Sequence, residues 1–310
     1  MIPTLPGARR AAVVSLTAGA LMAVSALASP AQAAAAPTVS AKGGFLLNQA
    51  TGATVFSKTA DTRRQMASTT KIMTAAVVLS TKGVDLDRKV TVKQAYRDYV
   101  AKEGASTADL RTGDKLTVRQ LLYATMLPSG CDAAYALADT FGTGSTNAAR
   151  TKSFIAKMNA KATELKLKNT KFDSFDGISQ GGQNYTTPRD LAKIAQYAMK
   201  YTNFRSTVKA TSYKSTAPTS TGGKRTYTWY QTNQLLGSYN GAVGIKTGTG
   251  TAAGPCLVFA ATRGSKTLVG VVLNSSDRYK DAAKLLDYGF GSSTAKTMKL
   301  RSLPSDAQSD

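Results

Sequence analysis

Short apolar runs near both ends of the chain are separated by polar turns and predict β-strands. Near the start, the runs at 43–47 and 53–56 lie on either side of a polar, glycine-containing turn, which predicts a hairpin. Near the end, residues 243–245, 257–261 and 268–273 form three further short runs with glycine between them. These five runs are the candidates for the strands of a sheet.

Apolar residues at helical spacing dominate the segment between the two groups of strands. Ile72, Ala75, Ala76 and Leu79 recur on one face from Lys71 onward, as in a helix with a buried side. Further helices are predicted at 121–127, 132–138, 154–165, from Thr187-Pro188 onward, and at 282–290. In the helix that starts with Thr187-Pro188, the threonine is expected to cap the first turn with proline at its first position.

The order of these elements predicts the fold class. Strands, a long helical middle, and then more strands with a closing helix indicate an α/β (α+β) fold. We expect a sheet domain built from residues 34–84 together with about 205–293 and a mainly helical domain inserted between them at 85–204. The polar tail at 294–310 could fray.

The first 33 residues have the pattern of an export signal rather than of a folded element. Arg9 and Arg10 precede an uncharged apolar run at 11–28, and Ala31-Gln32-Ala33 has the small residues that a signal peptidase recognises. We therefore expect an exported protein from which residues 1–33 are removed; an uncleaved membrane anchor is the alternative. Beyond this leader, no run of about 20 apolar residues follows.

The chain is strongly basic, with 40 Lys and Arg residues against 18 Asp and Glu residues and a net charge of +22. Such a surplus favours an anionic partner. The basic residues are scattered, and no arginine-rich tract or nucleic-acid-binding motif is present. For an exported protein we therefore expect anionic cell-envelope polymers or a lipid surface as partners, and no nucleic acid.

The absence of histidine restricts the chemistry available. It excludes Ser-His-Asp and Cys-His catalysis and most zinc sites, and neither a metal nor a cofactor is expected. The two cysteines, Cys131 and Cys256, could form a disulfide in an exported chain. Because sequence alone does not establish their geometry, the alternative of a free Cys131 thiol stays open, and we favour it.

Ser68-Thr69-Thr70-Lys71 is a Ser-x-x-Lys motif at the start of an apolar helix. Residues three apart share a helix face, so the Lys71 amine can reach the Ser68 hydroxyl and serve as its base where histidine is absent. The same motif begins at Ser206 and at Ser293, so the pattern alone is weak. Ser68 is favoured because a buried-type helix follows it and a hairpin precedes it.

Two more motifs occur later in the chain. Lys246-Thr247-Gly248 ends an apolar run and continues with Thr249, and a glycine at a strand end allows a substrate backbone to approach closely. Ser129-Gly130-Cys131 interrupts two helical stretches, a position from which side chains can reach a binding site. Taken separately, each is also consistent with an ordinary strand end or helix–helix turn.

Together, the three motifs resemble the signature of penicillin-binding proteins and β-lactamases. The flanking residues, Met66-Ala67, 127–133 and 244–249, are similar to those of low-molecular-weight serine DD-peptidases, the D-alanyl-D-alanine carboxypeptidases and transpeptidases. The likeness extends over about residues 43–290 and is nearest to the actinomycete type with Ser-Gly-Cys in the middle. It implies a penicillin-binding/β-lactamase-like fold, in which helices flank an antiparallel sheet.

The resemblance also implies roles for individual residues. Ser68 would attack the carbonyl between two D-alanines of a peptidoglycan stem peptide, Lys71 would take its proton, and Ser129 would pass a proton to the departing D-alanine. Backbone N–H groups of Ser68 and Thr249 would hold the oxyanion. Substrate-binding residues would be Cys131, Lys246, Thr247, Gly248 and Thr249, and β-lactams would act as inhibitors.

Two alternatives stay open in this comparison. Cys131 stands where most of the family has asparagine, and a thiol is a weaker donor and acceptor than an amide. This makes a catalytically silent penicillin-binding module one alternative, although intact Ser68, Lys71 and Lys246 argue against it. A serine β-lactamase shares the motifs, but class A enzymes use a glutamate for deacylation. The only glutamates, Glu103 and Glu164, lie outside any recognisable motif of that kind.

Overall fold

The computed structural model describes Pro3, Gly7 and residues 35–308. The predicted leader at 1–33 therefore lies almost entirely outside the described residues. From residue 36 onward the chain forms one compact unit. No helix in the described part of the chain is both long enough and apolar enough to cross a bilayer.

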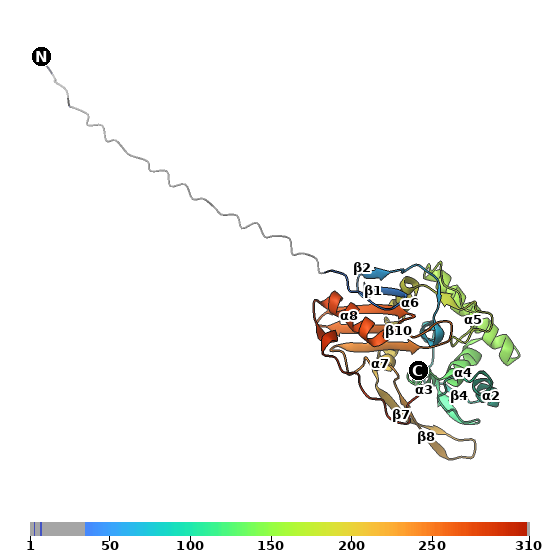
Figure 1. Cartoon of the computed structure of the whole chain (residues 1–310). Coiled ribbons are helices and arrows are strands. Elements are labelled where there is room, and N and C mark those ends of the chain that lie inside the picture. Colours follow the sequence, from blue (N-terminus) through green and yellow to red (C-terminus); the bar gives the residue numbers. More distant parts are fainter. Residues whose placement is uncertain (1–2, 4–6, 8–34, 309–310) are drawn as a thin grey trace. The chain divides into compact units, whose positions relative to one another are not determined.

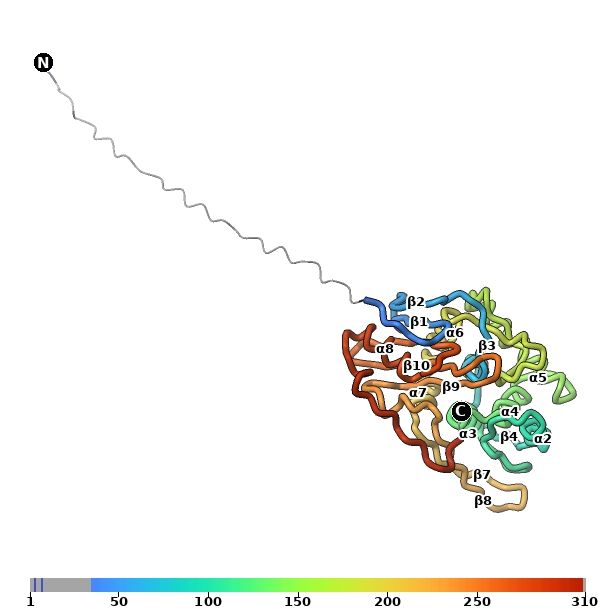
Figure 2. Tube along the Cα trace, in the orientation of Figure 1, coloured from blue at the N-terminus to red at the C-terminus, as the bar shows by residue number. Residues whose placement is uncertain are grey.

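A five-stranded antiparallel sheet is built from both ends of the chain, and this confirms the predicted fold class (Figure 1). The strand order is β2-β1-β11-β10-β9. The bounds are β1 Gly43–Asn48, β2 Thr54–Lys58, β9 Ala242–Gly248, β10 Cys256–Arg263 and β11 Lys266–Leu273. In Figure 2 the blue β1 and the orange β9 and β10 belong to the same layer.

Alternate residues of the strands face two different cores. In β10, Leu257 and Phe259 belong to a core that includes α8 (Arg278–Phe290), whereas Val258 and Ala260 belong to a larger core with the other helices. This alternation follows from the two-residue period of a strand. Because both faces are covered, the strands are continuous apolar runs in the sequence rather than alternating ones.

In the described part of the chain, seven helices lie between the two groups of strands. They are α1 Lys71–Ser80, α2 Gln94–Glu103, α3 Val118–Met126, α4 Cys131–Phe141, α5 Asn147–Glu164, α6 Pro188–Ala198 and α7 Thr202–Lys209. Helices α6 and α7 pack directly on the sheet, and the others pack mainly on neighbouring helices. Thr187 caps α6 as predicted, because its side chain accepts a hydrogen bond from the Asp190 N–H. The division into domains at residues 84/85 and 204/205 stays a prediction.

The remaining described strands lie outside the main sheet. Four of them are two or three residues long, and two longer ones form a hairpin. The short strands are β3 Arg64–Gln65 with β6 Tyr185–Thr186, and β4 Lys89–Thr91 with β5 Lys115–Thr117; the hairpin is β7 Ser212–Pro218 with β8 Lys224–Tyr230. There are also two short 3₁₀ helices in the described part of the chain. Ala67–Thr70 precedes α1, and Thr294–Lys296 follows α8.

The described part of the tail is held to the rest of the chain by hydrogen bonds of Arg301. The Arg301 guanidinium donates hydrogen bonds to the carbonyl oxygens of Gln231 at 2.7 Å and Leu236 at 3.0 Å. The Arg301 N–H donates to Ser238 Oγ at 2.7 Å. Polar composition suggested fraying, but a single arginine that satisfies several loop carbonyls fixes the segment.

Candidate active site

Ser68 lies in the 3₁₀ turn Ala67–Thr70, immediately before α1. The Lys71 Nζ atom lies 2.9 Å from Ser68 Oγ, so the predicted contact between the two side chains is present. Ser68 is half-buried, whereas the Lys71 side chain is completely buried. A nucleophile and its candidate base are therefore in contact, with the nucleophile on the accessible side.

Lys71 also brings together the middle motif and a loop that sequence reasoning missed. Its Nζ atom lies 3.5 Å from Ser129 Oγ, 3.3 Å from Cys131 Sγ and 3.0 Å from the Asp176 carbonyl oxygen. The lysine thus brings together three parts of the chain that are far apart in sequence: its own segment, the middle motif and the loop that carries Asp176. No recognisable motif marked Asp176 as one of them.

The backbone around the site adopts conformations that non-glycine residues seldom take. Ser129 has φ +64° and Ala67, just before the nucleophile, has φ +45°. Such left-handed residues cost free energy and persist where surrounding contacts hold them. Here the left-handed Ser129 separates α3 from α4 and has its hydroxyl directed at Lys71.

The loop that carries Asp176 packs closely against the nucleophile. A Cβ atom added to Gly177 would lie only 2.1 Å from the Ala67 carbonyl oxygen, and Gly177 has φ +105°, so only glycine fits here. The Asp176 carboxylate accepts a hydrogen bond from the Tyr99 hydroxyl at 2.8 Å. Burial and this neighbouring carboxylate raise the pKa of Tyr99 above its ordinary value, so Tyr99 stays a neutral donor that holds the loop.

The Lys246-Thr247-Gly248 motif forms the end of β9, next to Ser68. A Cβ atom on Gly248 would lie 3.0 Å from the backbone nitrogen atoms of both Ser68 and Thr69. Glycine therefore allows the strand to approach the 3₁₀ turn, as predicted for this position. The strand end and the nucleophile form one site.

The polar side chains at this strand end differ in their exposure to solvent. Lys246 is completely buried, and its Nζ atom lies 3.0 Å from the Thr247 carbonyl oxygen. The Thr247 hydroxyl is also buried and lies 2.6 Å from the Thr232 hydroxyl. Thr249 is exposed, and its hydroxyl accepts a hydrogen bond from Arg278 at 2.9 Å. The sequence had not singled out Thr232 or Arg278.

Cys131 is a buried free thiol at the first position of α4 and is not bridged to Cys256. Burial, with a smaller opposing effect of Lys71 and a further increase from Asp176, raises the pKa of the Cys131 thiol to about 12. At neutral pH the group is therefore protonated. A protonated thiol is a poor nucleophile, so Ser68, which is in contact with Lys71, is the candidate nucleophile.

Comparisons with known proteins show which family this chain is similar to. Residues 30–277 match the family Peptidase_S11, described as D-alanyl-D-alanine carboxypeptidase. A D-alanyl-D-alanine carboxypeptidase of Streptomyces sp. strain K15 is 57% identical over 287 residues, which cover 91% of this chain and 98% of that protein. DacF, a D-alanyl-D-alanine carboxypeptidase of Bacillus subtilis, is 33% identical over 259 residues, or 81% of this chain and 62% of its own length.

The fold has a solved counterpart as well. The crystal structure of the Streptomyces K15 DD-transpeptidase aligns with a TM-score of 0.81 and 59% sequence identity. The alignment covers 83% of this chain and 99% of that one.

Proposed function

Because this chain belongs to the D-alanyl-D-alanine carboxypeptidase family Peptidase_S11, we propose that it cleaves the D-alanyl-D-alanine end of peptidoglycan stem peptides. It is a serine-type enzyme that forms an acyl-enzyme and releases D-alanine, by hydrolysis or by transfer to an amine. The observation that carries this function is the 2.9 Å contact between Lys71 Nζ and Ser68 Oγ beside the Lys-Thr-Gly strand. Penicillin-sensitive release of D-alanine from such a peptide tests it.

In the acylation step, the Lys71 amine takes the hydroxyl proton of Ser68 while Ser68 Oγ attacks the carbonyl carbon between the two D-alanines. The attack produces a tetrahedral oxyanion, which the backbone N–H groups of Ser68 and Thr249 would stabilise. The closeness of Gly248 to the Ser68 nitrogen supports this pairing. Lys71 is suited to its role because it is buried and already in contact with the serine.

Collapse of the intermediate breaks the amide bond and leaves the acyl group on Ser68. The departing D-alanine nitrogen needs a proton, and we assign its delivery to Ser129. The 3.5 Å separation of Ser129 Oγ from Lys71 Nζ supports a relay in which Ser129 passes on the proton that Lys71 received. Water or an amine then attacks the ester, and the same groups act in reverse.

The terminal carboxylate of the substrate would bind at the end of β9. Lys246 supplies positive charge from within the strand, and the exposed Thr249 hydroxyl lies where a ligand can reach it. Arg278 adds a second cation through its hydrogen bond to Thr249. The Thr247 hydroxyl would take part only by exchanging its bond to Thr232.

A β-lactam would acylate Ser68 by the same attack, and the acyl group is expected to persist. Rapid deacylation in class A β-lactamases depends on a glutamate. Here Glu103 pairs with Lys102 and accepts from Gln180, and Glu164 pairs with Lys161 at 2.6 Å. Neither glutamate is hydrogen-bonded to Ser68 or Lys71, so inhibition is favoured over β-lactam hydrolysis.

Cys131 provides a pH-dependent probe of the site. Because the pKa of its thiol is raised to about 12, we expect its reaction with an uncharged maleimide to accelerate about tenfold for each pH unit from 7 to 10. Modification should block penicillin acylation, since Sγ lies 3.3 Å from Lys71 Nζ. Timed mass spectrometry and labelling with a fluorescent penicillin measure both effects.

The matched control for that experiment is Cys131→Ala, which retains Cys256. This variant should be acylated by penicillin before and after maleimide treatment, because Ser68 and Lys71 make the bond. A reaction rate that levels off near pH 8.5, or a modified wild-type protein that still acylates, would contradict this placement of the thiol.

The family acts on the cell wall, outside the cytoplasm, and we propose that export depends on removal of residues 1–33. The basic start, the apolar run and Ala31-Gln32-Ala33 support this, and the N-terminal sequence of the exported protein tests it.

The surplus of 40 basic over 18 acidic residues supports a second proposal, that anionic envelope material binds the protein.

A further inference from the structure

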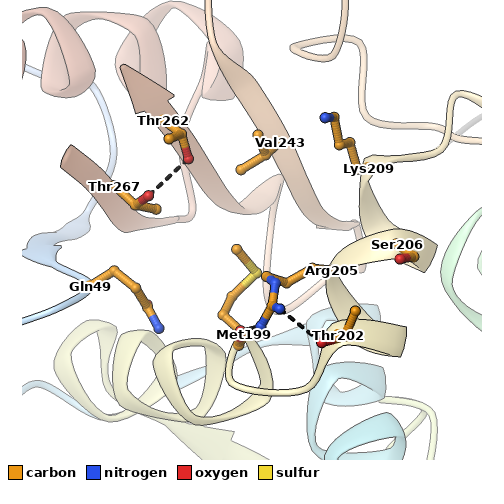
Figure 3. Close-up of a pocket in the computed structure, with 9 residues that line it drawn as sticks. All are labelled: Gln49, Met199, Thr202, Arg205, Ser206, Lys209, Val243, Thr262 and Thr267. Carbon is orange, nitrogen blue, oxygen red and sulfur yellow. Dashed lines mark hydrogen bonds between the residues drawn. The ribbon is translucent and has the colours of Figure 1, made fainter. Parts of the chain in front are cut away.

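A cavity of about 440 Å³ is lined by residues that do not belong to the three catalytic motifs (Figure 3). We call it the distal pocket and define it by Gln49, Arg205, Lys209, Val243, Thr262 and Thr267. Val243 precedes Lys246 by three residues in β9, or about 10 Å along an extended strand. Thr262 and Thr267 pair near the turn between β10 and β11, whereas Gly248 pairs with Cys256 at the catalytic end.

The charged groups of the distal pocket are cations. Figure 3 shows Arg205 and Lys209 extending from α7 beside the cavity. Arg205 is held in place, since its guanidinium donates to the Met199 carbonyl oxygen at 2.7 Å and to Thr202 Oγ at 2.9 Å. The Lys209 side chain is exposed and forms no hydrogen bond or ion pair with any described residue. No carboxylate lines the cavity, so it favours an anionic group.

The neutral groups of the pocket point to a ligand that also carries hydroxyl groups. Gln49 Nε2 donates to the Gln196 carbonyl oxygen at 3.0 Å, but Gln49 Oε1 is buried without a hydrogen-bond partner among the described residues. A buried acceptor is stabilised when a donor reaches it. On another wall, the Thr262 and Thr267 hydroxyls lie 2.9 Å apart. A hydroxyl-bearing anion satisfies both the cations and the acceptor.

A second basic cavity adjoins the distal pocket at Gln49 and Gln196, each of which donates from its side chain to the backbone carbonyl oxygen of the other. Gln196 Nε2 donates to the Gln49 carbonyl oxygen at 2.9 Å, and Gln196 lines this second cavity of about 400 Å³. Its cations are Lys166, Lys193, Lys200 and Arg189. No carboxylate lines it, although Arg189 is paired with Asp61. Two adjoining cationic cavities suit a ligand with repeated negative charges.

We propose that the two cavities bind consecutive units of a polyol phosphate polymer. Phosphates would contact Lys209 and Arg205 in one cavity and Lys200 in the next, and polyol hydroxyls would donate to Gln49 Oε1. This inference rests on the proposed location of the enzyme at an anionic envelope. A polymer is favoured over a membrane surface because the charges surround cavities, and Leu300 is the only exposed large hydrophobic residue in the described part.

The test uses the charge reversals Lys209→Glu and Lys200→Glu in the full exported protein, with Lys224→Glu as the matched control. Lys224 is an exposed lysine of the β7–β8 hairpin and lines neither cavity. The probes are soluble poly(glycerol phosphate), glycerol 3-phosphate and phosphatidylglycerol vesicles. Calorimetry should show the polymer binding more tightly than the monomer. Each cavity reversal should weaken polymer binding about tenfold, and the control less than twofold.

Every other outcome overturns the proposal. Equal weakening by Lys224→Glu would show attraction to net charge alone, binding to vesicles without binding to the soluble polymer would show a membrane surface, and no binding would exclude the site. Thermal unfolding of each variant checks the fold. D-Alanine release from a soluble peptide should be unchanged in Lys209→Glu, so the binding result stands or fails separately from the peptidase function.

Discussion

Replacement of Ser68 by alanine is expected to abolish both covalent labelling by penicillin and release of D-alanine. The substitution removes the oxygen atom to which the acyl group would be attached, and leaves Lys71 with its contacts to Cys131 and Asp176. The fold should therefore survive while the chemistry is lost completely. Intact-mass analysis of the penicillin-treated variant measures the first effect, and an assay for free D-alanine measures the second.

Ser206 and Ser293 provide matched controls because each also begins a Ser-x-x-Lys sequence. Ser206 lies on α7, and its partner in the motif, Lys209, is exposed to solvent. Ser293 lies before the 3₁₀ helix Thr294–Lys296, with no buried lysine beside it. Ser206→Ala and Ser293→Ala should both be labelled as the wild type is. Labelling that persisted in Ser68→Ala would refute the assignment of the nucleophile.

Replacement of Lys71 by arginine is expected to slow penicillin acylation by about 100-fold to 10,000-fold, the range attributable to a general base. Arginine is always protonated in proteins, so it supplies a positive charge but cannot accept the Ser68 proton. Lys71→Ala should lose a similar factor, because it removes the base altogether. Stopped-flow measurement of acylation by a fluorescent penicillin gives the rate for each variant.

The comparison between these two variants separates the proton-transfer role of Lys71 from a purely electrostatic one. If Lys71 acted only through its charge, Lys71→Arg would retain most of the acylation rate while Lys71→Ala lost it. Because Lys71 is buried and contacts four partners, thermal unfolding must show that the variants are folded. Near-normal acylation in folded Lys71→Arg would contradict the proposed base.

Much of the fold was predictable because local patterns and tertiary packing agree. The hairpin of β1 and β2, the three late strands, α1 and α6 all follow from apolar spacing and turn or cap residues. Helix α2 was missed since Tyr96 is its only buried residue, which leaves almost no apolar periodicity to detect. The sheet order, in which β1 lies between β2 and β11, depends on contacts between distant segments and has no local signal.

The candidate site was predictable where the chemistry is local in sequence. Ser68 and Lys71 are three residues apart, so helical geometry alone brings them together. The resemblance to a known family, rather than any physical pattern, linked Ser129 and Lys246 to them. Asp176 contributes a backbone carbonyl to Lys71, and any residue type could supply that group. Arg278 meets Thr249 only through the packing of α8 beside the sheet, so sequence alone did not single it out.

The most direct test of the central claim is a titration of D-alanine release against the fraction of Ser68 that carries penicillin. Mass spectrometry of proteolytic peptides gives that fraction, and the same samples are assayed with a peptide ending in D-alanyl-D-alanine. We expect release to fall in proportion to the adduct and to reach zero when one persistent adduct per chain is mapped to Ser68. Release that continued in fully acylated protein, an adduct on another residue, or rapid loss of the adduct would contradict the account.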